Sequence, residues 1–528
     1  MLLLGKAPLC AIMRDLLTEP ARFRWPSLQR RLARSRLAKG IFLLALGCLF
    51  SASGHAQDRL CKVIPAGQDF WIRLTDPVST YSSKIGSAVK AILIASPNCD
   101  DSAAFATRTT VEGHITHVRR VGFGVWHSSS AVTIDFDKLV AGPQTFAIKA
   151  RVEEVANGRE NVKAGVIRGA DGQATPQQII STRLLHLPFW NTEDYWIFLL
   201  RRGAFPFSPE PETFLPAGTD LRLRLTAPLE LPAEFVKARQ EQEEDTKQGA
   251  EIDEDMRAKL VALPAHSSTR SGRPSDVVNL AFIGSREQIE AAFQAAGWTY
   301  GDSVSAWSVV LEMRAFSSLS SYPHLPISNQ WLAGKPADIR LQKSLDSYQK
   351  RDHIRIWNEN ELAPDLWAAS AIHETGASWS IRTGRFIHHV DSDIDAESER
   401  VVRDLTLAGC VADVHRVQRP EKPETERNSS GDELWTDGGV EVLELTDCQS
   451  PAIVAISSSD EIAWRPNSKL KRFARAQVLS IHDIWRSNAI YASFDISRAV
   501  IHSLRRRRAR EYETKVNISV KPPSSDPN

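Results

Sequence analysis

The segment Arg385-Phe-Ile-His-His-Val-Asp-Ser-Asp-Ile-Asp-Ala-Glu-Ser-Glu-Arg400 shows most clearly how the second half of the chain folds. Its first part predicts a strand. Its acidic continuation predicts the first turn of a helix, because carboxylates stabilise helix N-termini. Two histidines and five acidic residues lie within these sixteen positions. Strand-to-helix junctions often carry functional groups, so we expect a candidate site here, although the motif specifies no substrate.

Other elements are predicted around this segment. Val277–Ile283 is predicted as a strand, and Ser285 with Gln288 forms a capping box for the helix that follows. Further elements are predicted as strands at His353–Trp357, Leu366–His373 and Phe386–Asp391 and as a helix at Ala396–Ala408. The alternation of strands and helices predicts an α/β domain over residues 276–415.

Residues 57–231 are predicted to form a β-rich domain. Two similar segments, Ile64–Pro77 and Leu215–Pro228, each contain a Pro-Ala-Gly turn followed by an alternating strand. We expect related strands that start and close one sandwich or barrel. The predicted fold class is therefore α+β multidomain, with a β-rich sandwich or barrel followed by an α/β domain.

The remaining segments are a connector and an extension. Residues 232–275 are predicted as a charged helix and linker, and residues 416–528 as a mixed C-terminal extension with a basic helix at Asp495–Arg510. Arg505–Arg508 suit the negative end of that helix dipole, and binding to anionic lipid headgroups is the alternative interpretation. A length of 528 residues is consistent with two or three domains.

The N-terminus has the pattern of an export signal. Basic residues from Arg30 to Lys39 precede the apolar run Ile41–Phe50, and small residues follow up to Ala56. Residues 1–56 are therefore predicted as a cleaved signal peptide that directs the protein to the periplasm or cell envelope. An uncleaved N-terminal membrane anchor and lipidation at Cys48 are the alternatives.

Charge and cysteine content constrain the partners of the exported chain. Removing residues 1–56 takes away nine basic and two acidic residues, which leaves 56 basic and 62 acidic residues and a net charge of −6. This balance argues against a nucleic-acid partner. Four cysteines remain, and the local pairing predicts disulfides Cys61–Cys99 and Cys410–Cys448, with two other pairings possible.

Four stretches support a resemblance to a known family. They are Val278–Glu287, Ala292–Trp298, Arg351–Trp357 and Phe386–Asp395. Over about residues 275–415 the chain resembles the LssY C-terminal domain family, which implies no established activity. Some relatives are fused to a membrane phosphatase of the type-2 phosphatidic-acid class. The sequence has neither the motifs nor the transmembrane bundle of that module, so the resemblance implies no lipid phosphatase chemistry.

Strand parity selects the candidate site residues. His353 and Arg355 share one face of their strand, and His389 and Asp391 share one face of theirs. If the two strands are neighbours, these four side chains converge as candidate catalytic groups. Asp395, at the start of the next helix, joins them in a list of possible metal ligands: His353, His389, Asp391 and Asp395.

Three interpretations of this site remain open. The residues could hold a divalent metal that activates water, which would be the possible cofactor. They could form a cationic pocket for a phosphate or carboxylate group. Alternatively, the acidic residues only stabilise the helix N-terminus and the histidines form hydrogen bonds within the sheet. His373-Glu-Thr375 also imitates the His-x-Thr pair of two-histidine phosphoesterases.

We therefore expect an exported, envelope-associated protein with a binding or assembly role. Its expected partner is an envelope component or an anionic ligand, and the sequence specifies no oligomeric state. The alternative is a metal- or His/Arg-dependent hydrolase that acts on a phosphorylated or lipidic envelope substrate.

Overall fold

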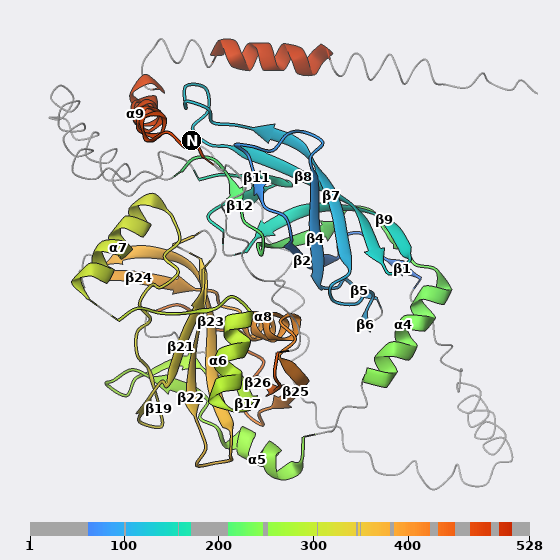
Figure 1. Cartoon of the computed structure of the whole chain (residues 1–528), viewed down its shortest axis with the longest axis vertical. Helices are drawn as coiled ribbons and strands as arrows, with labels where there is room; N and C mark the ends of the chain where they lie inside the picture. The colour runs from blue at the N-terminus through green and yellow to red at the C-terminus, as the bar shows by residue number, and fades with distance from the viewer. Residues whose placement is uncertain are drawn as a thin grey trace, which may run out of the picture. The chain divides into compact units, whose positions relative to one another are not determined.

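The fold is described from a computed structural model (Figure 1). It describes residues 62–99, 102–156, 158–170, 210–246, 252–303, 305–344, 347–348, 350–380, 385–422, 431–448, 465–486 and 496–508. The predicted signal peptide, residues 1–56, and Cys61 lie outside the described residues.

The β-rich N-terminal part is a six-stranded antiparallel barrel. The strands follow the order β8-β7-β4-β2-β13-β9, and pairing between β8 and β9 closes the barrel. Their bounds are β2 Asp69–Leu74, β4 Ala88–Ala95, β7 Thr110–Arg119, β8 Ala131–Ala141, β9 Gln144–Val155 and β13 Asp220–Leu225. Buried apolar side chains alternate with more exposed ones along β8, as the wall of a filled barrel requires. Of the two predicted alternatives, the structure has the barrel.

Short strands extend the barrel. β10 (Asn161–Lys163) and β11 (Val166–Arg168) continue the sheet from β8. Three further pairs are β1 (Val63–Ile64) with β14 (Leu229–Glu230), β3 (Val78–Ser79) with β12 (Phe214–Leu215), and β5 (Asn98–Cys99) with β6 (Ser102–Ala103). The two similar sequence segments form β2 and β13, which pair directly with each other.

A second large sheet carries the candidate site. Its order is β18-β21-β22-β23-β17-β26-β25, and β24 also pairs with β23. The bounds are β17 Leu280–Ile283, β18 Thr299–Tyr300, β21 Ile339–Lys343, β22 Arg351–Asn358, β23 Leu366–Ser380, β24 Arg385–Val390, β25 Val411–Gln418 and β26 Gly439–Leu445. Only β17 and β26 are parallel among the paired strands of this sheet in the described residues. The predicted α/β architecture is therefore not confirmed.

Two helices cover one face of this sheet. α6 (Arg286–Ala295) and α8 (Ile394–Leu407) contact each other and β26, and Figure 1 shows α6 in front of the sheet. Ser285 and Gln288 form the predicted capping box of α6, and Asp393 caps α8. Apolar side chains of both helices and of β22 and β23 form one core, which buries Phe293, Val401 and Ile354.

The opposite face has its own core. α5 (Glu254–Ala262) contributes Leu260, which packs with Trp357 and Ala368 of the sheet. A small sheet is formed by β15 (His266–Ser268), β16 (Pro274–Val277), β19 (Trp331–Leu332) and β20 (Lys335–Pro336). Apolar layers on both faces bury the central strands, so charged residues on β22 are buried as well.

The remaining described helices are α4 (Ala233–Thr246), α7 (Ala306–Ser318), α9 (Lys469–Arg486) and residues 496–508. Within the described part of the chain, none of the helices has the length and hydropathy of a membrane span.

The predicted disulfide between Cys410 and Cys448 is confirmed, with an S–S distance of 2.07 Å. The other predicted pair includes Cys61, which lies outside the described residues.

Candidate functional site

The two strands that carry the sequence-predicted residues are not neighbours. β23 lies between β22 and β24 and pairs with both. The expectation that His353 and the His389–Asp391 pair converge across adjacent strands is therefore wrong. The physical reason is the length of β23, whose last residues pair with β24 while its earlier residues pair with β22 and β17.

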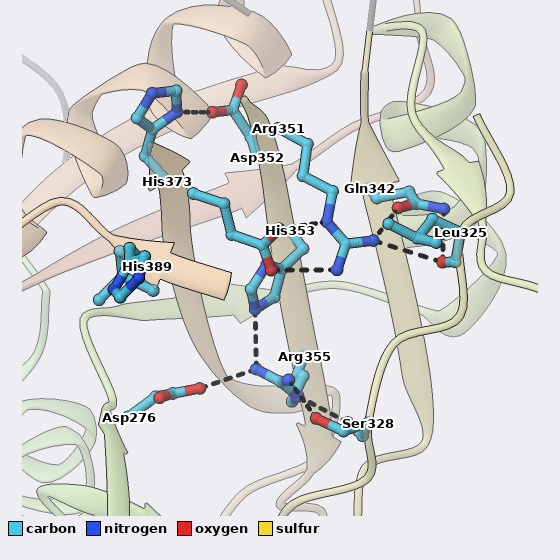
Figure 2. A network of polar contacts seen from close by, with 12 residues as sticks. Asp276, Leu325, Ser328, Gln342, Arg351, Asp352, His353, Arg355, His373 and His389 are labelled. Carbon is cyan, nitrogen blue, oxygen red and sulfur yellow. Dashed lines mark hydrogen bonds and ion pairs between the residues drawn. The ribbon is translucent and has the colours of Figure 1, made fainter. Parts of the chain in front are cut away.

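His353 and Arg355 lie together on one face of β22 in a closed polar network (Figure 2). Arg355 Nη1 donates to His353 Nε2 at 3.0 Å and to Asp276 Oδ2 at 2.7 Å. Arg355 Nε donates to the Ser328 carbonyl at 3.0 Å, and Nη2 donates to the Ser328 hydroxyl at 3.1 Å. All three guanidinium nitrogens of Arg355 therefore donate hydrogen bonds within the protein.

Arg351 extends the same network. Its guanidinium forms a bidentate ion pair with Glu374, at 2.6 and 3.0 Å, and donates to Gln342 Oε1 at 2.6 Å. His353 Nδ1 lies 3.2 Å from Glu374 Oε1. Burial and, after it, the nearby positive charge of Arg355 lower the pKa of His353, so the imidazole is neutral at pH 7. Arg351 and Arg355 are thus each paired with a buried carboxylate, Glu374 and Asp276 respectively.

The other predicted site residues have separate partners. His389 is about half exposed, and its Nδ1 lies 3.0 Å from Asp432 Oδ1. Asp391 accepts a hydrogen bond from the Asp393 amide at 3.1 Å, as in an Asx turn. Asp395 is buried and accepts from Thr436 Oγ1 and from the Asp437 amide, each at 2.7 Å.

These contacts give each of the four expected metal ligands a different set of partners. Asp393 accepts from the Ala396 amide at 3.1 Å and begins α8, while Asp395 holds the loop that follows Trp435. The acidic residues therefore have the contacts of a helix N-terminus and its neighbouring loop. His353 and Asp395 contribute to no common ligand set within the described residues.

A different cluster has the arrangement of a metal site. Asp352, His373 and Glu397 each present one ligand atom, and these atoms lie within 4.8 Å of one another. Asp352 and His373 face each other across β22 and β23, and Glu397 comes from the first turns of α8. The exposed fractions of the three residues are 0%, 7% and 1%, so the cluster lies inside the layer between sheet and helix.

The hydrogen bonds of this cluster are unequal. His373 Nδ1 donates to Asp352 Oδ1 at 2.6 Å, which fixes the orientation of the imidazole (Figure 2). Both carboxylate oxygens of Glu397 are buried without a hydrogen bond. Arg400 Nε lies 3.1 Å from Glu397 Oε2 in an ion pair, but it is not aligned to donate.

Burial and the negative charge of Asp352 raise the pKa of Glu397, and Arg400 opposes this effect. Arg400 Nη1 is also 3.9 Å from Asp352 Oδ1. One guanidinium therefore lies beside two buried carboxylates.

The sequence contains a signal for this cluster. Asp352 lies on the same strand face as Ile354 and Ile356, and His373 lies on the same strand face as Ala371 and Ala369. Glu397 lies four residues before Val401, on the apolar face of α8. Ionisable residues at core-facing positions of three elements are unusual, because an unpaired charge is costly to bury.

Comparisons with known proteins identify part of the chain. No curated protein matches it. Among solved structures it is similar to ComB10 of the Com type IV secretion system of Helicobacter pylori, with 10% identity over 34% of this chain and 96% of that chain. The TM-score is 0.21, so this likeness supports no argument about fold or function. Residues 260–440 match the family model described as LssY C-terminus, so this part of the chain contains the domain that the sequence resemblance predicted.

Proposed function

We propose that the protein is exported and binds the anionic lipid surface of the cell envelope as a peripheral protein, through the helix at residues 496–508. The observation that supports this proposal is the exposure of apolar side chains on a basic helix. Ile496, Val500 and Leu504 are 65%, 52% and 54% exposed.

The spacing of these residues defines an amphipathic helix. Ile496, Val500 and Leu504 follow one another at intervals of four residues and therefore lie on one face. Arg498, His502 and Arg505 recur at intervals of four and three residues on the opposite face. A helix with an apolar stripe and a basic opposite face is typical of segments that lie in the membrane interface.

The helix dipole accounts for only part of this pattern. Arg505–Arg508 lie in the last turn, where cations stabilise a helix by about 0.3–1 kcal/mol. That effect needs no apolar residues on the helix. Isolated helices of fewer than about 12–15 residues are marginal in water, so this helix gains stability when its apolar face is covered. The arginines favour an anionic lipid surface as the cover.

A second exposed apolar group is consistent with interfacial binding. The connection between β7 and β8 contains Phe123, Val125 and Trp126, which are 58%, 49% and 58% exposed. Aromatic side chains are enriched at the level of lipid headgroups because their rings are amphipathic.

Hydrolysis by His353, Arg355, His389 and Asp391 has less support. Catalytic groups must lie within hydrogen-bond reach of one reacting centre. Arg355 is already paired with Asp276, and His389 lies beside Asp432 on a strand that does not neighbour β22. The described contacts therefore support a binding role better than they support catalysis by these four residues.

Vesicle co-sedimentation of the full chain tests the proposal. We expect binding to phosphatidylglycerol vesicles and much weaker binding to phosphatidylcholine vesicles. Each Arg near an anionic surface contributes about 1 kcal/mol, so Arg505→Gln with Arg506→Gln should weaken binding roughly 25-fold. Val500→Ser with Leu504→Ser should also weaken it, because apolar area is lost from the interface.

Matched variants elsewhere serve as controls. Arg270→Gln with Arg273→Gln removes two exposed arginines, and Ile85→Ser removes an exposed apolar side chain from the barrel. These variants should bind as the unaltered chain does. Equal binding to both lipids, or equal losses in helix and control variants, would reject the proposal. Fractionation of cells tests export separately, because full-length protein in the cytosol contradicts it.

A further inference from the structure

We propose that Asp352, His373 and Glu397 form a binding site for one first-row divalent cation, with zinc or manganese favoured. The site is independent of the proposed membrane-binding helix. It also differs from the ligand set expected from the sequence, with which it shares no residue.

The geometry of the three side chains supports the site. Their ligand atoms lie within 4.8 Å of one another, and they come from β22, β23 and α8. Atoms at this mutual distance can bind a common ion at bond lengths of about 2.0–2.2 Å after small side-chain movements. A bound cation would join the two central strands to the helix that covers them.

An independent observation is the state of Glu397. The residue is 1% exposed, and neither carboxylate oxygen has a hydrogen bond. A buried carboxylate in this condition is costly unless a proton, a cation or donors neutralise it. Arg400 supplies one positive charge to Glu397 and Asp352 together, at 3.1 and 3.9 Å. A divalent cation would ligate the Glu397 carboxylate, whose oxygens have no hydrogen bond.

The chemistry of the donors selects the class of metal. One imidazole and two carboxylates form a mixed nitrogen and oxygen set without sulfur. Zinc and manganese accept such sets, whereas calcium and magnesium prefer oxygen ligands alone.

Metal analysis of the purified full chain is the test. After chelator treatment, the protein is loaded with Zn²⁺ or Mn²⁺, desalted and measured for bound metal by mass spectrometry. We expect one ion per chain and a higher melting temperature than for the chelated protein. Mg²⁺ should produce neither effect at the same concentration.

Two substitutions distinguish a metal from a proton on Glu397. Glu397→Gln preserves shape and should lower metal affinity at least tenfold, as should His373→Gln. His389→Gln removes a histidine from a neighbouring strand outside the cluster and should retain one ion. If Glu397 only holds a proton, the unaltered chain binds no stoichiometric ion. Glu397→Gln then changes neither the bound metal nor the effect of metal on the melting temperature.

X-ray absorption spectroscopy of the zinc-loaded chain gives the ligands without any substitution. We expect nitrogen and oxygen neighbours that include one imidazole. A sulfur shell would place the ion at cysteines and overturn the proposal, as would equal metal retention by the unaltered chain and Glu397→Gln. The spectrum remains decisive if a variant fails to fold.

Discussion

At the residue scale, the buried charges of β22 are held by specific partners. Arg351 and Glu374 are 5% and 3% exposed and form two parallel hydrogen bonds. Such a pair offsets much of the cost of removing both charges from water only while both members are present. The intact pair therefore adds little net stability, but the loss of one member leaves a buried charge without its partner.

Removing one member of this pair should be strongly destabilising. Arg351→Gln takes both bidentate hydrogen bonds from the buried Glu374 carboxylate, and we expect a loss of about 3–5 kcal/mol in the free energy of unfolding. Denaturant unfolding measures the loss. Arg351→Gln with Glu374→Gln should recover part of it, because no unpaired charge remains. A loss below about 1 kcal/mol for the single variant would contradict this account of the network.

A second ion pair gives a prediction about pH. Asp69 accepts hydrogen bonds from Arg224 at 2.6 and 2.8 Å and from Arg222 at 2.9 Å. The hydrogen bond from Arg224 is the main cause that lowers the pKa of Asp69 below 3.8. A lowered folded-state pKa stabilises the protein above the unfolded value, and this contribution is lost as the pH falls through the folded value.

Asp69→Asn should therefore cost stability only where the carboxylate is ionised. We expect about 1 kcal/mol at pH 7, since the side chain is 29% exposed and solvent screens the pair. The difference should shrink as the pH falls through the lowered folded-state pKa of Asp69, because the carboxylate is then protonated in both states. Unfolding of Asp69→Asn, Arg224→Gln and the double variant at several pH values measures the coupling. A difference that grows as the pH falls would have the wrong sign.

Residue patterns predicted part of the site. Parity correctly placed His353 and Arg355 on one face of β22, where they form a hydrogen bond. It could not show that β23 separates β22 from β24, because strand order depends on contacts between distant segments. For the same reason, strand parity did not predict that Glu397 lies near Asp352 and His373.

At the element scale, local signals predicted helix ends better than strand lengths. The capping box of Ser285 and Gln288 is a contact within one turn, so its residues are sufficient to predict it. β23 was predicted to end at His373 but continues to Ser380, where β24 provides its partner. A strand whose partner lies farther along the chain has no complete local signal.

The disulfide acts on the edge of the second sheet. Cys410 precedes β25 and Cys448 follows β26, and these two strands pair at the end of the sheet. Its sequence separation of 38 residues corresponds to about 4 kcal/mol in the chain-entropy account of disulfide stabilisation.

Removing this disulfide should lower stability by about 2–4 kcal/mol. Cys410→Ala with Cys448→Ala is compared with the unaltered chain by thermal unfolding, with and without a thiol reductant. The double variant should melt at a lower temperature under both conditions. Equal melting temperatures under oxidising conditions would show that the bond does not stabilise the edge.

At the scale of the whole molecule, turn signals and alternation predicted a β-rich sandwich or barrel that the two similar segments start and close, but they did not distinguish a barrel from a sandwich. Closure requires pairing of β8 with β9 and of β2 with β13, the latter between segments far apart in sequence. The second sheet was predicted as α/β from its alternating elements. Its strands β22 and β23 are joined by residues 359–365, a connection too short for a parallel crossover, which needs about a dozen residues.

The helix at residues 496–508 is the proposed contact of the molecule with the membrane. The helix at residues 496–508 exposes Val500 and Leu504 in the described structure and should bury them in an anionic lipid surface. Binding should also order the helix, because its apolar face is then covered.

Hydrogen–deuterium exchange of the full chain, with and without phosphatidylglycerol vesicles, tests this claim most directly. We expect slower amide exchange at residues 496–508 when vesicles are present and unchanged exchange in the barrel strands. Unchanged exchange at residues 496–508 in the presence of vesicles would contradict it.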